Sequence, residues 1–135
     1  MTRHEIREAE FLLLFEKTFR DESVADLITQ HEIDYEYKCD EEIEATTQEI
    51  VEKIPELDEI ITKFSTSRSI SRIPKVNLSI LRLAIFEILY RADKVPQNAV
   101  VNEAVGLTKT YAQETDVRFV NGVLGAFTRS LKKDE

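Results

Sequence analysis

One stretch of this chain, residues 75–91, constrains its fold more than any other. Leu78, Leu81, Ile85 and Ile88 recur at helical spacing, and further apolar side chains fill the flanks between them. A helix that is apolar nearly all round must be buried nearly all round. The segment is therefore predicted to be the central helix of the fold.

The rest of the chain also has helical spacing and no convincing strand. Three Gly and three Pro are too few for a barrel or sandwich, which needs frequent turns. Thr2 with Glu5 forms a capping-box pattern, and Ser23 is a second candidate N-cap. Residues 31–38 are predicted to be a linker. Helices are predicted over about 2–20, from Ser23, over 40–53, over 55–64 with Pro55 in the first turn, over 75–91, from Pro96 or Asn98, and from Thr115 or Asp116. The predicted fold class is all-α.

The 135 residues fit one domain with two helical halves. A polar, Ser-rich stretch at 65–74 is predicted to connect them. The N-terminal subdomain then covers about 1–66, and the C-terminal subdomain about 74–135. Short connections elsewhere predict antiparallel packing of neighbouring helices.

The sequence offers little chemistry for catalysis, metal binding or cofactor binding. A single cysteine, Cys39, excludes a disulfide framework and a thiolate zinc cluster. His4 and His31 lie in acidic surroundings and are predicted to be solvated surface residues. We therefore expect no enzyme activity, no metal and no cofactor. The charged N-terminus and the lack of a long apolar run predict a cytoplasmic protein without a membrane span.

Gly122 and Gly125 match the spacing of a loop that clamps nucleotides in one class of RNA-binding domain. Here both glycines fall within the apolar stripe of the last helix. They are predicted to allow close packing between helices instead.

Charge is distributed unevenly along the chain. The net charge is −8, yet residues 63–135 hold 12 basic and 7 acidic residues, whereas residues 1–62 hold 6 and 19. Residues 63–82 contain five basic residues and no acidic one. Two interpretations stay open: a local basic surface on an acidic protein, or ordinary solvated helix faces.

Three segments of the C-terminal half, 80–88 (ILRLAIFEI), 101–111 (VNEAVGLTKTY) and 118–125 (RFVNGVLG), resemble the signature of the NusB transcription antitermination family. Their order and spacing, with Pro96 before the second segment, are similar to that family as well. The resemblance implies two three-helix bundles packed around a long central helix. It also implies pairing with NusE, a small-subunit ribosomal protein, and binding to the boxA RNA of ribosomal RNA leaders within an RNA polymerase antitermination complex.

The resemblance assigns RNA contacts to basic and aromatic residues at both ends of the chain. Acidic residues interleave the first two arginines, where the family favours basic or small ones. Arg118, beside a helix N-terminus, is suited to a phosphate contact, whereas Phe119 can either stack on a base or belong to the core. The assigned residues are Arg3, Arg7, Lys109, Arg118 and Phe119.

The resemblance assigns the protein partner to the first and central helices, through Phe15, Asn77 and Glu87. Asn77 stands where many members have an acidic residue. A homodimer is a further expectation. Two alternatives stay open: a protein-interaction module of the same fold that lacks RNA binding, and the NusB-like domain found in certain ribosomal RNA methyltransferases. Against the second, the sequence holds no glycine-rich cofactor loop.

Overall fold

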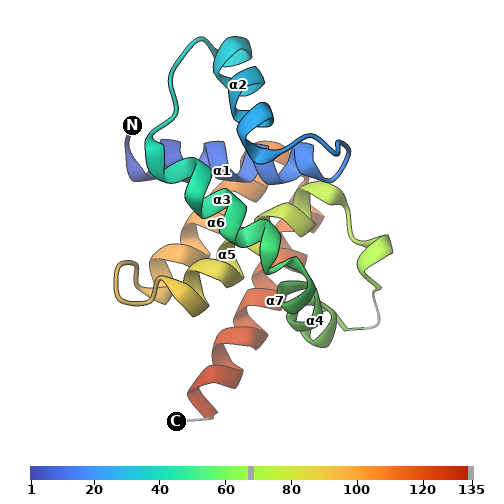
Figure 1. The fold of residues 1–135 in the computed structure, drawn as a ribbon. Coiled ribbons are helices and arrows are strands. Elements are labelled where there is room, and N and C mark those ends of the chain that lie inside the picture. Colours follow the sequence, from blue (N-terminus) through green and yellow to red (C-terminus); the bar gives the residue numbers. More distant parts are fainter. Residues whose placement is uncertain (67–68, 134–135) are drawn as a thin grey trace. The chain divides into compact units, whose positions relative to one another are not determined.

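The computed structural model describes residues 1–66 and 69–133, with residue 133 described by its backbone only. This part of the chain consists of helices and the segments that connect them, with no strand (Figure 1). The all-α prediction is confirmed. The elements are α1 (Arg3–Lys17), α2 (Val24–Tyr35), α3 (Glu41–Glu52), α4 (Ile54–Phe64), the short 3₁₀ helix η1 (Ile70–Arg72), α5 (Lys75–Tyr90), α6 (Gln97–Tyr111) and α7 (Glu114–Lys133).

The two N-caps predicted from the sequence, Thr2 and Ser23, are confirmed by their hydrogen bonds. At the start of α1, the Glu5 N–H donates to Thr2 Oγ1 at 3.0 Å and the Thr2 N–H donates to Glu5 Oε1 at 2.8 Å. The bond from the Thr2 N–H to the carboxylate is the main cause that lowers the pKa of the Glu5 carboxyl. At the start of α2, the Asp26 N–H donates to Ser23 Oγ at 3.1 Å. Side chains therefore satisfy N–H groups that the helices leave unpaired.

The prediction for residues 31–38 is wrong in part, because α2 continues to Tyr35. The side chain of His31 is only 3% exposed, so the expectation of a solvated surface histidine is wrong as well. Tyr37 folds back onto the helix, and its hydroxyl lies 2.9 Å from His31 Nε2. Glu36 makes this reversal possible by ending α2 in the left-handed region, with φ of 57°.

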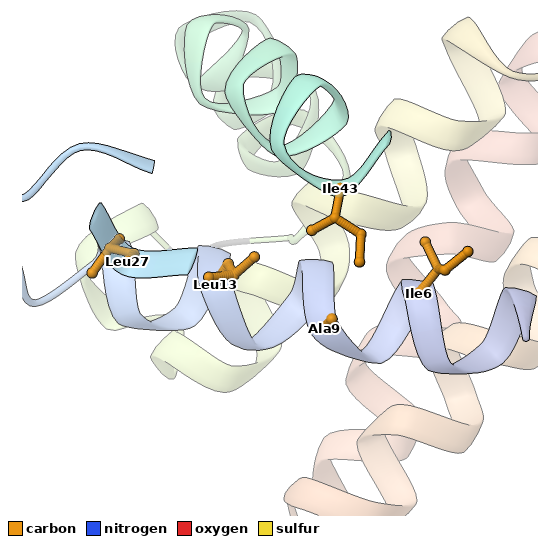
Figure 2. Close-up of a cluster of buried hydrophobic side chains, with 5 residues drawn as sticks. All are labelled: Ile6, Ala9, Leu13, Leu27 and Ile43. Carbon is orange, nitrogen blue, oxygen red and sulfur yellow. The ribbon is translucent and has the colours of Figure 1, made fainter. Parts of the chain in front are cut away.

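The chain divides into two compact units, an N-terminal unit (Met1–Lys53) and a C-terminal unit (Ile54–Glu135). In the N-terminal unit, Ile6, Ala9 and Leu13 follow one side of α1, and Figure 2 shows Ile43 of α3 pointing toward them. Leu27 of α2 completes this cluster. These buried side chains hold α1, α2 and α3 together as a three-helix bundle.

In the C-terminal unit, α5 packs against α4, α6 and α7 (Figure 1). Every residue from Asn77 to Phe86 is buried, as the apolar pattern of 75–91 predicts. The compact units divide after Lys53, earlier than the stretch 65–74 proposed from the sequence, because α4 packs against α5 and α7. Within 65–74, residues 69–74 include η1, whereas residues 67 and 68 lie outside the described part.

No helix in the described part of the chain is long and apolar enough to cross a membrane. Among the same residues, no group of three or more His, Cys, Asp or Glu side chains is arranged to hold a metal ion.

Candidate nucleic-acid interface

An open groove of about 380 Å³ lies between α7 and the end of α4, within the C-terminal unit. The described residues that line it include two arginines and no acidic residue, on a chain with a net charge of −8. We call it the α7 groove; it is lined by Phe64, Ser65, Thr66, Arg118, Phe119, Gly122, Val123, Ala126 and Arg129.

The local sequence of α7 explains how the groove is built. Val123 and Phe127 are buried, and Phe127 meets Phe64 of α4 edge-on, with 5.8 Å between the ring centroids. This contact holds α7 against the end of α4, and these two helices form the sides of the groove. Gly122 and Ala126 each directly precede one of these buried residues, lie one turn apart from each other, and leave a low floor along the open side. The apolar stripe of α7 therefore has a polar edge that carries the arginines.

Arg118 and Phe119, which the resemblance assigns to RNA contacts, both line the groove. Arg118 is exposed, whereas Phe119 is half-buried and presents only part of its ring. Lys63 adds positive charge beside the groove, because its Nζ lies 5.4 Å from the centroid of the Phe64 ring. Cationic and aromatic groups thus occur together on one surface, as nucleic-acid binding requires.

The start of α7 differs from the expected anion site. The N–H of Gln113, which precedes the helix, donates to Asp116 Oδ2 at 3.0 Å, so a carboxylate of the chain already caps this end. Asn77 Nδ2 donates to the other oxygen, Asp116 Oδ1, at 2.9 Å. Asn77 is completely buried in this structure, so the partner contact proposed from the sequence is corrected: its side chain joins α5 to α7.

The glycines of α7 do not allow close helix packing, which corrects the sequence interpretation. A Cβ atom at Gly122 would meet nothing within 4 Å. A Cβ atom at Gly125 would meet only the guanidinium Nη1 of Arg129, at 3.3 Å. Gly122 lines the open groove, and neither residue has a helix pressed against it.

The basic residues of α1 are less available than the sequence suggested. Arg3 is exposed, but its guanidinium forms an ion pair with Glu42 of α3, with 2.8 Å between Nη2 and Oε2. Arg7 is only 8% exposed. Lys109, in contrast, is exposed in the last turn of α6.

An aromatic series on α1 includes the proposed partner contact Phe15. Phe15 is half-buried and lies between Phe11, at 6.3 Å, and Phe19, at 5.2 Å, measured between ring centroids. Phe19 follows the end of α1 and is 63% exposed. Glu87 is partly exposed on α5.

Sequence reasoning missed Arg129, Gly122 and the end of α4 as parts of one site. Arg118, Gly122, Ala126 and Arg129 are spaced by four, four and three residues, which places them on one helix face. This spacing, which is visible in the sequence, could have placed these four residues in one site. The contribution of Phe64 was not visible, because it depends on a contact between helices far apart in the sequence.

Comparison with known proteins identifies relatives over the whole chain. A model of the NusB family matches residues 4–129. The transcription antitermination protein NusB of Natranaerobius thermophilus is 36% identical, over 98% of this chain and 99% of the relative. The protein of the same name from Agathobacter rectalis is 40% identical, over 94% of this chain and 99% of the relative.

A solved structure agrees with this relationship. The crystal structure of the antitermination factors NusB and NusE in complex with dsRNA has a TM-score of 0.77 and 29% identity to this chain. The match covers 96% of this chain and 99% of that chain.

Proposed function

The chain belongs to the NusB family, and we propose that it is a transcription antitermination factor that binds RNA and pairs with the ribosomal protein NusE. The observation that carries the proposal is the α7 groove, whose described lining residues include two arginines and no acidic residue on an acidic chain. The solved relative in complex with NusE and dsRNA supports it. The role is recognition rather than catalysis, and we expect it in the cytoplasm, where leader RNA is transcribed.

In this proposal the RNA is the boxA element of ribosomal RNA leaders. Arg118 binds a phosphate, and the exposed part of the Phe119 ring stacks on an unpaired base. Lys109 is a further phosphate contact from α6. Arg3 contributes only after its pair with Glu42 opens, so its contribution is expected to be small. We propose only a minor contact for Arg7, because its side chain is almost completely buried.

We propose two separate contacts for NusE, one in each unit: Phe15 of α1 as an anchor, and Glu87 of α5 as a charged contact. Half-buried aromatic side chains are common anchors at protein interfaces. A basic ribosomal protein also offsets the acidic N-terminal unit, which repels RNA. NusE is therefore expected to raise RNA affinity, and RNA must raise NusE affinity by the same factor.

The test is filter binding of boxA RNA and a scrambled control, with and without NusE, over a series of salt concentrations. Removing one phosphate contact from a single strand lowers the slope of log affinity against log salt by about 0.7. We expect Arg118→Ala to produce this change. Lys94→Ala is the matched control, since it also removes one exposed positive charge but lies outside the groove.

Phe119→Ala tests stacking separately from charge. We expect a loss of about 1–3 kcal/mol in RNA binding with an unchanged salt slope. Thermal unfolding must accompany this measurement, because Phe119 is half-buried and also packs in the fold. If neither boxA RNA nor the scrambled control binds, with or without NusE, the proposal of RNA recognition is wrong. That result would favour the alternative of a protein-interaction module, which the 16 acidic residues of the N-terminal unit also suit.

A further inference from the structure

The two glycines of α7 face open space rather than another helix, and this needs an explanation. Glycine in the middle of a helix costs about 1 kcal/mol relative to alanine. A Cβ atom at Gly122 would meet nothing within 4 Å, and one at Gly125 would meet only Arg129. Packing within the fold therefore does not require either glycine. What they do provide is a low floor beside the α7 groove.

Arg129 is the second cation of the groove. It is exposed, and its Nη1 lies 3.3 Å from the position that a Cβ atom of Gly125 would take. Its side chain thus lies back along α7 over the glycine. Arg118 and Arg129 are eleven residues apart on one helix face, which corresponds to a rise of about 16 Å along the axis. The helix therefore carries two separated positive charges with small residues between them.

We propose that Arg129 is a second phosphate contact, that Gly122 keeps the floor between it and Arg118 open for a single RNA strand, and that Gly125 leaves room for the Arg129 side chain to lie along α7. This inference rests on the proposed RNA-binding function and extends it. One strand lies along α7, with phosphates at the two arginines and a base against Phe119. Charge complementarity supports RNA as the occupant, since the described lining residues carry two positive charges and no negative one.

The groove suits a single strand better than a duplex. Its volume of about 380 Å³ is close to the lower end of the range for small-ligand sites. The phenylalanines at 64 and 119 line it and can stack only on bases that are not already stacked within a helix. A duplex can still reach the arginines through its phosphates, and it gains nothing from the aromatic rings.

Arg129→Ala is the first test, with Lys132→Ala as its matched control. Both residues are exposed cations near the end of α7, but only Arg129 lines the groove. For single-stranded boxA RNA with NusE present, we expect Arg129→Ala to lower the salt slope by about 0.7, which corresponds to about fourfold weaker binding at 0.15 M salt. Lys132→Ala is expected to change binding less than twofold. Arg129→Lys should restore most of the loss.

Gly125→Asp tests the position and charge of the Arg129 side chain without replacing Arg129 itself. Aspartate at this position stands four residues before Arg129, the spacing at which opposite charges pair on a helix, and it also occupies the space beside the guanidinium. We expect binding to weaken by more than fourfold. Asn98→Asp is the control, because it adds the same charge at an exposed position of α6 outside the groove. Gly125 is partly buried, but a Cβ atom there would meet only the guanidinium of Arg129, so the substitution is not expected to prevent folding; thermal unfolding checks this.

The outcomes separate the inference from the proposed function. If Arg118→Ala weakens binding while Arg129→Ala and Gly125→Asp behave like their controls, RNA binding stands and the inference is wrong. If a boxA duplex binds the native protein as tightly as the single strand, the assignment to a single strand is wrong. If the native protein with NusE binds no RNA, the proposed function and the inference both fail.

Discussion

The ion pair between Asp58 of α4 and Arg82 of α5 allows a quantitative test of what holds the C-terminal unit together. Arg82 donates from Nε and Nη2 to the two carboxylate oxygens of Asp58, each at 2.9 Å. The side chain of Arg82 is 10% exposed and that of Asp58 is 21% exposed. Removing one partner of a buried pair costs about 3–5 kcal/mol, because the other charge stays buried. Since Asp58 is partly exposed, we expect Asp58→Ala to cost about 3 kcal/mol, at the low end of that range.

The assay is urea denaturation followed by far-UV circular dichroism, and the chain contains its own control. Arg3 and Glu42 form the same type of pair in the N-terminal unit, with side chains 61% and 48% exposed. Glu42→Ala is expected to cost at most about 1 kcal/mol, and only this cost should shrink in high salt. Equal costs for the two variants would refute the reasoning, because burial would then make no difference. The variant with both Asp58→Leu and Arg82→Met is expected to recover most of the lost stability.

Three further predictions concern stability. Leu81→Ala in α5 should lower the free energy of unfolding by about 2–5 kcal/mol in urea denaturation, and a cost below about 0.5 kcal/mol would contradict a core position. Glu36→Gly should raise stability by about 1 kcal/mol in the same assay, since a left-handed φ of 57° strains a residue that has a Cβ. Burial lowers the pKa of His31 below its ordinary value of 6.5, so the unfolded chain takes up the proton first and stability falls as pH drops below about 6.5. His31→Phe should flatten this part of a pH series of unfolding measurements.

Local signals made most of the fold predictable from the sequence. The capping box of Thr2 and Glu5 depends only on residues three apart, and the start of α4 depends on Pro55 alone. The burial of α5 followed from a pattern within one segment. Such features need no knowledge of the rest of the chain, so a single sequence contains them.

The features that failed depend on contacts between distant residues. From the sequence, Asn77 is expected at the surface near the start of a helix. Its hydrogen bond to Asp116, 39 residues away, shows instead that it is internal. Arg82 counted toward a basic stretch until its partner Asp58 on a neighbouring helix became visible. Polar residues on buried faces are retained where a partner satisfies them, and spacing alone does not reveal that partner.

Net charge is a poor guide to whether this protein binds RNA, and the structure gives the reason. The N-terminal unit holds 16 acidic and 6 basic residues, whereas the C-terminal unit holds 10 and 12. At physiological ionic strength, charges are screened over about 8 Å, so a strand in a groove responds mainly to the charges that line it. Among the described residues that line the α7 groove, those charges are Arg118 and Arg129. In the proposed mode of binding, the acidic residues of the N-terminal unit slow the approach of RNA, and a basic protein partner offsets that charge. The charges that line the groove then govern binding at the proposed site, while the charge of the whole chain gives a basic partner a role.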